Sequence, residues 1–77
     1  MSDIVGLTTS SWGGTSLALI YSDGSVDNNG YLVEGDEIVS ISNQGSNAIV
    51  ISKDRDGDRY SSIVRLRDGE IIGFGRI

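Results

Sequence analysis

The stretch that decides the fold is Ile63-Val64-Arg65-Leu66-Arg67-Asp68-Gly69-Glu70-Ile71-Ile72-Gly73-Phe74-Gly75-Arg76-Ile77. Two short apolar runs flank an Arg-Asp-Gly turn, which is typical of a hairpin at the end of a small sheet. The outer strand of such a hairpin leaves backbone N–H and C=O groups unpaired, and an unpaired edge is a template for another chain. The stretch therefore predicts assembly through strand pairing. Arg67, at the turn, is the first residue that we expect to contact a ligand.

The size of the chain points in the same direction. It has 77 residues with no Cys and no His, so we expect one domain, residues 1–77, with residues 1–14 as an N-terminal arm or short element. A domain this small buries only roughly 60 % of the surface of its unfolded chain. Disulfides and the usual zinc ligands are excluded as staples. Oligomerisation is the remaining source of stability.

Hydropathy favours a protein away from membranes. No apolar run approaches the length of about 20 residues that a membrane-spanning helix needs. Residues 1–15 lack the basic start and apolar stretch of a secretion signal, and the absence of Cys is compatible with a reducing compartment. We therefore expect a cytoplasmic protein with no membrane partner.

The charge is unevenly distributed. The net charge is −5, all six basic residues lie in the last 25 positions, and the first 52 positions hold six acids and no base. An acidic balance opposes loose binding to nucleic acid, because phosphate contacts need positive charge. One interpretation is a folded module with an acidic face and a locally basic face. The other is solvated surface charge that keeps a sheet protein soluble.

The pattern along the chain predicts an all-β protein. Eleven Gly, no Pro and many Val, Ile, Ser and Thr suit short strands joined by tight turns. Five strands or slightly more, nearly all linked by hairpins, favour a strongly bent sheet or small barrel. The expected strands are Ser16–Ser22, Glu37–Ser42, Ala48–Lys53 (central), Arg59–Leu66 and Glu70–Ile77, with a loop at Asn43–Asn47 and a hairpin tip at Asp54–Asp58.

The candidate chemistry is sparse. The acids of Asp54–Asp58 alternate as in a calcium loop, but an EF-hand needs Gly and Glu where Arg59 and Arg65 stand. A charged hairpin tip is the favoured interpretation. Without His or Cys the common nucleophile and base pairs cannot form, so we expect no enzyme, no metal and no cofactor. Trp12 and Tyr31 are either stacking platforms for bases or core or interface residues.

Two regions of the chain resemble the motifs of Sm and LSm proteins. Leu66–Ile77 resembles the second Sm motif, in which a strand ends at an Arg, turns and continues as an apolar strand with a late Gly. Ile38–Ile51 is similar to the latter half of the first motif, and Tyr21-Ser22-Asp23-Gly24 to the turn that opens it. The resemblance implies a strongly bent five-stranded barrel. It also implies a closed ring, in which the fourth strand of one subunit pairs with the fifth of the next.

The same resemblance implies a site for single-stranded, often U-rich, RNA near the central pore. Asn47 corresponds to the residue that reads the base, Arg67 to the cation that stacks on it, and Asn43 to a supporting loop anchor. The position that usually supplies a stacking side chain falls at about Gly45. A second resemblance, to the trp RNA-binding attenuation protein, rests on Ile4–Thr8, Leu32–Asp36 and Ala48–Ile51. It also implies a ring that binds RNA, but the basic residues of that family fall on Val50 and Ser52.

The sequence thus predicts a Sm-like homo-oligomeric ring that binds single-stranded RNA or DNA near its pore. The expected partners are further copies of the chain, joined by edge-strand pairing, and single-stranded RNA. The alternative is a structural or protein-interaction ring, of phage type, that does not bind nucleic acid.

Overall fold

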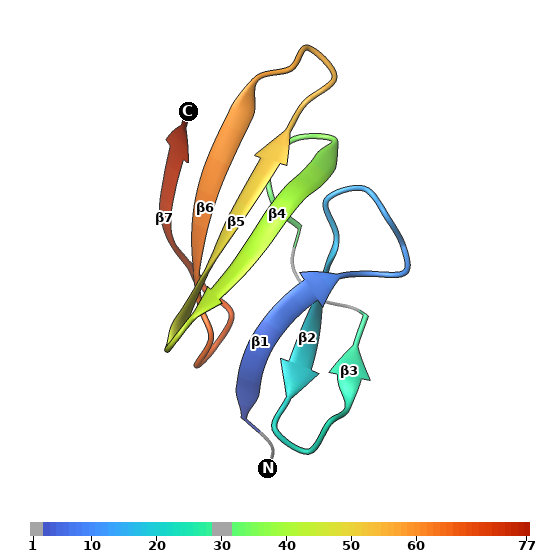
Figure 1. Ribbon diagram of the computed structural model, residues 1–77, viewed down its shortest axis with the longest axis vertical. Helices are drawn as coiled ribbons and strands as arrows, with labels where there is room; N and C mark the ends of the chain where they lie inside the picture. The colour runs from blue at the N-terminus through green and yellow to red at the C-terminus, as the bar shows by residue number, and fades with distance from the viewer. Residues whose placement is uncertain (1–2, 29–31) are drawn as a thin grey trace.

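The computed structural model describes residues 3–28 and 32–77, which form seven strands and no helix (Figure 1). The predicted all-β class is confirmed. No described segment has the length and apolar character of a membrane-spanning helix. In chain order the strands are β1 Ile4–Thr9, β2 Leu17–Tyr21, β3 Val26–Asp27, β4 Glu37–Gln44, β5 Asn47–Lys53, β6 Arg59–Arg65 and β7 Ile71–Arg76.

The strands are arranged in two antiparallel sheets, with the orders β1-β2-β3 and β4-β5-β6-β7. Each sheet is a meander, so within a sheet every strand pairs with the strands that precede and follow it in the chain. We expected one bent sheet of about five strands, whereas the described residues form two sheets and no closed barrel. The break lies at Gly35, where φ is +105° and a Cβ would stand 2.8 Å from the Lys53 carbonyl oxygen. The chain therefore turns sharply against the end of β5 before it enters the second sheet.

The predicted strands of the second half are confirmed to within a residue or two. The hairpin tip at Asp54–Asp58 joins β5 to β6, and β5 lies inside its sheet between β4 and β6. The predicted loop Asn43–Asn47 is wrong, because only Gly45 and Ser46 separate β4 from β5. Gly45 adopts φ +64°, a left-handed conformation that suits such a short turn. The N-terminal segment contains β1, one of the forms that we considered.

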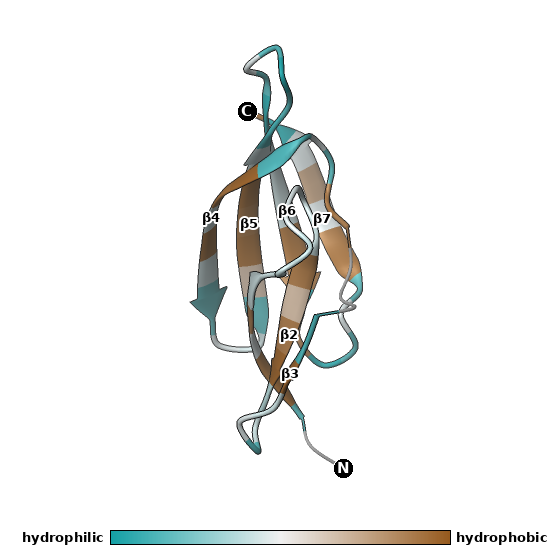
Figure 2. Ribbon diagram, turned by 90° about the vertical axis from the view of Figure 1, so that its right-hand side faces the viewer, coloured by the Kyte–Doolittle hydropathy of each residue, from teal (hydrophilic) through white to brown (hydrophobic). Residues whose placement is uncertain are grey.

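The core lies between the two sheets. Figure 2 looks towards the four-stranded sheet with β2 and β3 in front of it. Side chains along β5 and β6 alternate between buried and half-buried, as in a sheet with one covered face. The half-buried outer face carries Ile49, Ile51 and Ile63. The buried apolar cluster comprises Leu7, Leu17, Leu19, Val33, Ala48, Val50, Val64 and Leu66.

Candidate functional site

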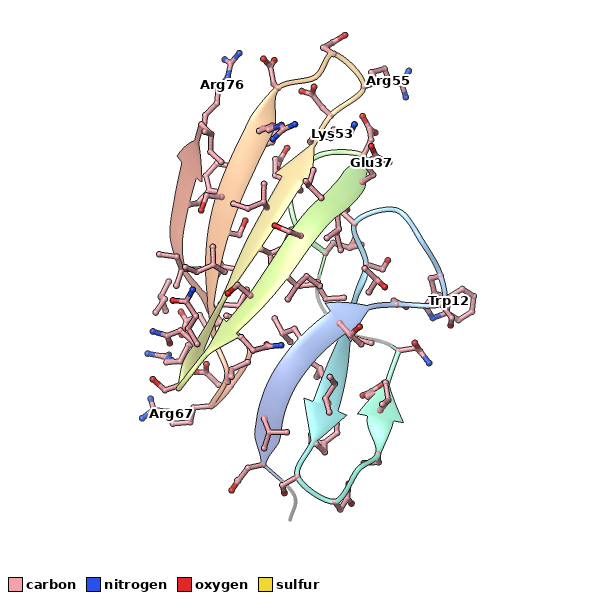
Figure 3. The ribbon with its side chains drawn as sticks, in the orientation of Figure 1. Trp12, Glu37, Lys53, Arg55, Arg67 and Arg76 are labelled. Atoms are coloured by element: carbon pink, nitrogen blue, oxygen red, sulfur yellow. The ribbon has the colours of Figure 1, made fainter. Side chains whose placement is uncertain are left out.

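Asn47 and Arg67 lie at the same end of the four-stranded sheet. The Leu66 amide donates a hydrogen bond to the Ser46 carbonyl oxygen at 2.9 Å, which holds the β6–β7 turn beside the β4–β5 turn. Asn47 is the cross-strand partner of Arg65, and Arg67 follows two residues later. In Figure 3, Arg67 points outward at this end, and Arg55 and Arg76 lie at the other end. We call the two adjoining turns, residues 44–47 and 65–70, the turn end.

Asn43 has a different position from that expected. Its side-chain oxygen accepts a hydrogen bond from the Leu7 amide at 2.9 Å, and its side-chain nitrogen donates to the Leu7 carbonyl oxygen at 3.3 Å. It pairs with the buried Ala48, so it shares the inner face of the sheet, whereas Asn47 lies on the outer face. The Asn43 side-chain amide thus bonds Leu7 in the way that a backbone peptide group of a neighbouring strand would, and it links β4 to β1. The side chain of Asn43 is therefore engaged within the chain, and its expected role as a supporting loop anchor for nucleic acid stays a prediction.

The β6–β7 turn is held together by charge-assisted hydrogen bonds. Arg65 bonds both carboxylate oxygens of Asp68, at 3.1 and 2.7 Å, and also pairs with Glu70. The hydrogen bond from Arg65, with that from the Glu70 amide, lowers the pKa of Asp68 to about 2. The same bond raises the pKa of Arg65. Arg65 is therefore occupied in shaping the turn.

Arg67 is the cation that remains available at the turn end. It is exposed and takes part in none of the ion pairs found among residues 3–28 and 32–77. Its charge contributes to the lowered pKa of Asp68. The two arginines and two carboxylates of residues 65–70 nevertheless sum to zero charge. Binding of a polyanion here depends on gathering several copies of Arg67, or on base contacts rather than phosphate contacts.

The predicted stacking residues do not join this end. Gly45 occupies the exposed tip of the turn and has no side chain to stack. Trp12 lies in the loop between β1 and β2 and projects away from both sheets (Figure 3). Tyr31 lies outside the described residues. The ring pair that is present, Tyr60 with Phe74, stacks with centroids 5.8 Å apart across β6 and β7.

The hairpin tip at the other end is closed by Asp54. One of its oxygens accepts hydrogen bonds from the amides of Asp56 and Asp58, both at 3.0 Å, and the other accepts from the Tyr60 hydroxyl at 3.1 Å. Partial burial raises the pKa of Asp54, but these hydrogen bonds outweigh it and the pKa lies below its ordinary value. The carboxylate caps the turn, as the hairpin-tip interpretation predicts.

The sequence pattern did not reveal a groove beside β7. Its volume is about 320 Å³, and Ser62 forms part of its wall. The Ser62 hydroxyl is buried and has no hydrogen-bond partner in the described part of the chain, which is uncommon in native structures. The signal in the sequence is a serine at an inward-facing position of the strand Arg59–Arg65, opposite Phe74. The lining residues are Leu32, Val33, Glu34, Ser62, Ile71 and Phe74.

β7 itself is an edge strand with an exposed apolar surface. It pairs with β6 on one side, and no described strand pairs with its other side. Ile71 and Phe74 are 41 % and 59 % exposed, although they lie on the inner face with Val64 and Ser62. Leu32, across the groove, is 68 % exposed.

Comparison of the chain with family models, with curated proteins and with solved structures found no match.

Proposed function

We propose that this protein is a self-assembling β-module whose copies are joined through β7. The observation that carries the proposal is an edge strand that is both unpaired and flanked by exposed apolar side chains, Ile71 and Phe74. Free backbone groups on an edge attract another strand, and contiguous exposed apolar surface marks an interaction site. Pairing with a strand of another copy satisfies the free backbone groups of β7 and buries its exposed apolar side chains.

The partner strand that we propose is β4 of the next copy. β4 and β7 are the two outer strands of a four-stranded antiparallel meander and therefore run in opposite directions. Adding β4 of a neighbour beside β7 continues the antiparallel order without a break. Such a head-to-tail contact closes into a ring when the rotation between copies allows it. The sequence resemblance also implies a ring, but one in which the fourth predicted strand, Arg59–Leu66, pairs with the fifth, Glu70–Ile77, of the next subunit. Those strands are β6 and β7, which pair within one chain, so the ring proposed here uses a different pair of strands.

A second function, binding of single-stranded nucleic acid, is favoured by the position of Asn47 and Arg67. The Leu66–Ser46 hydrogen bond brings the two residues to one end of each copy, and a ring gathers these ends around one opening. The Arg67 guanidinium is suited to stacking on a base, and the Asn47 amide offers both a donor and an acceptor to a base edge. The proposed role is binding without turnover. The alternative is a structural or protein-interaction ring.

Assembly is tested by measuring solution mass over a range of concentrations. We expect the native chain to form oligomers and Phe74→Lys to be monomeric, because a buried, unpaired lysine at the contact is costly. The control is Val26→Lys, which places the same charge on an exposed residue of β3 (51 % exposed) and leaves assembly unchanged. A native chain that is monomeric at every concentration contradicts the proposal.

Nucleic-acid binding is tested with a short U-rich RNA. We expect affinity that weakens with added salt and falls at least about tenfold in the Asn47→Ala, Arg67→Ala double variant. Arg55→Ala removes the same charge at the opposite end, from a side chain that is 85 % exposed, and serves as the control. Absent affinity at low salt, or equal loss in both variants, removes this function and leaves the assembly proposal intact.

A further inference from the structure

We propose that the groove beside β7 is filled by Trp12 of a neighbouring copy. This inference rests on the proposed self-assembly, and it names the side chain that makes the contact. It joins three observations, which are an apolar groove that no described side chain fills, a hydroxyl on a lining residue without a described partner, and an exposed indole elsewhere on the same chain.

The groove has the size and lining of a receptor for one large side chain. Its volume of about 320 Å³ lies at the small end of the range of about 300–1,000 Å³ for ligand sites. Leu32 forms one wall, and Ile71 and Phe74 form the other. All three are exposed by more than a third of their surface, so an occupant removes apolar surface on both sides from water.

Ser62 shows what kind of occupant fits. Ser62 lines the groove, and its buried hydroxyl has no hydrogen-bond partner among the described residues. Ser52, the other fully buried serine of the same face, donates to the Glu34 carbonyl oxygen at 2.6 Å. One of the two hydroxyl groups is thus paired within the fold, and the other, on a residue that lines the groove, has no partner among the described residues. Because an unpaired buried polar group is unfavourable, an occupant that carries an N–H donor on an apolar body is preferred.

Trp12 has that combination. It is the one tryptophan of the chain, it is 75 % exposed, and its indole nitrogen is a hydrogen-bond donor only. The large apolar side chains Val5, Val26, Val39, Ile72 and Ile77, which are also more than a third exposed, have no such donor. Trp is also the residue type most enriched among the side chains that dominate binding interfaces.

The loop that carries Trp12 is ordered in a way that presents the indole. The Trp12 amide donates to the Ser10 hydroxyl at 3.2 Å, and that hydroxyl donates to the Asn28 carbonyl oxygen at 2.9 Å. The Gly13 amide donates to the Ser10 carbonyl oxygen at 3.1 Å. The backbone is therefore fixed while the side chain projects into solvent (Figure 3), which lowers the entropy lost on binding.

The head-to-tail arrangement puts the indole on the correct side. Copies added through β7 and β4 extend one sheet, so every three-stranded sheet lies on the same face of it. The groove opens on that inner face, because Ser62 and Phe74 point towards the core. Trp12 belongs to the loop that follows β1 of the three-stranded sheet. The Trp12 loop of the next copy thus lies on the side of the sheet from which the groove is entered.

The single tryptophan makes the test direct. We expect the fluorescence emission of the native chain to move to shorter wavelength, and acrylamide quenching to decrease, over the same concentration range in which the mass increases. Phe74→Lys, expected to be monomeric, provides the emission of exposed Trp12. Trp12→Ser should weaken assembly by roughly 30-fold or more, as for a central interface residue. Trp12→Phe, which keeps an aromatic body without the N–H, should weaken it less than Trp12→Ser.

Two further variants separate groove filling from general apolar association. Leu32→Asp places a charge in the groove wall outside β7 and should weaken assembly at least about tenfold. Ser62→Ala removes the acceptor and should abolish the difference in assembly between native Trp12 and Trp12→Phe. Val26→Asp, which lies on β3, should leave both mass and emission unchanged.

The outcomes are distinguishable from failure of the assembly proposal. Oligomers by mass with emission and quenching of exposed tryptophan overturn the Trp12 inference and leave assembly standing. Short-wavelength emission that persists in monomeric Phe74→Lys shows that Trp12 packs within its own chain and also overturns it. A native chain that never assembles removes both proposals.

Discussion

The strands β1 and β7 are both outer strands of their sheets, but the backbone groups on their outer edges have different partners. On β1, the N–H and C=O groups of Leu7 are both bonded by the side-chain amide of Asn43. On β7, no described strand or side-chain amide takes the outer edge. The outer edge of β1 is thus tied to the second sheet at Leu7, whereas the outer edge of β7 has no such bond among the described residues. The comparison shows that one outer strand of this fold is held from outside its own sheet and another is not.

The side chains of β1 and β7 also differ in burial. Leu7 is 2 % exposed and belongs to the core, whereas Phe74 is 59 % exposed beside an unfilled groove. Gly6 allows the close approach on the β1 side, since a Cβ there would stand 3.3 Å from the Asn43 amide. The β1 strand thus packs within the chain, whereas β7 carries exposed apolar side chains, on which the proposed contact between chains depends.

The largest effect that tests this contrast is expected from truncating the two side chains. Leu7→Ala should lower the free energy of unfolding by about 2–5 kcal/mol, because it removes a buried side chain and leaves a cavity. Phe74→Ala should cost the monomer about 1 kcal/mol, mainly from the lost stacking on Tyr60. Urea unfolding at a concentration where the chain is monomeric measures both. Equal losses would show that β7 packs as tightly within the chain as β1.

The next effect concerns the amide that closes the β1 edge. Asn43→Ala should lower the free energy of unfolding by about 1–3 kcal/mol, since two hydrogen bonds to Leu7 are lost together. Asn47→Ala, four residues away on the outer face, should change it by less than about 0.5 kcal/mol. The same urea experiment compares the two. An Asn43→Ala protein as stable as the native chain would mean that water replaces the amide without cost.

A smaller effect is expected from the glycine beside that amide. Gly6→Ala should destabilise the chain by about 1 kcal/mol, because the added methyl group displaces the Asn43 side chain from Leu7. Gly75→Ala on β7 meets no atom within 4 Å and should have almost no effect on monomer stability. Thermal unfolding of the two variants at equal, low concentration measures the difference. A neutral Gly6→Ala would indicate that β1 moves aside freely.

The smallest effect is a pH dependence in the turn that leads into β7. The pKa of Asp68 is lowered from 3.8 to about 2 by Arg65, so its contribution to stability is present above about pH 4 and is lost as the pH falls towards 2. Asp68→Asn should therefore be less stable than the native chain at pH 7, and the two melting temperatures should converge by about pH 2. A constant difference across this range would assign the effect to something other than ionisation.

The sequence predicts the second half of the fold well because its signals are local. Alternating apolar residues, Asp-Gly turns and the absence of Pro place β5, β6 and β7 to within a residue or two. The proximity of Asn47 and Arg67 also follows from hairpin order, since two hairpins of similar length return to the same end. The role of Asn43 could not be predicted from hairpin order, because its partner Leu7 lies 36 residues away. A side-chain amide can bond a nucleic-acid base or a protein backbone equally well.

Composition and short-range pattern thus determine that this chain is all-β, that it pairs by hairpins, and that an apolar strand ends its second sheet. The chain passes from the first sheet to the second where Gly35 turns against Lys53, a contact between distant residues that the local pattern does not predict. The satisfied edge of β1, the unpaired hydroxyl of Ser62 and the groove beside β7 are likewise decided by how the two sheets pack. Strand formation follows from the periodicity of neighbouring residues. Bonded strand edges, unpaired buried hydroxyl groups and grooves are formed only when segments distant in the sequence pack together.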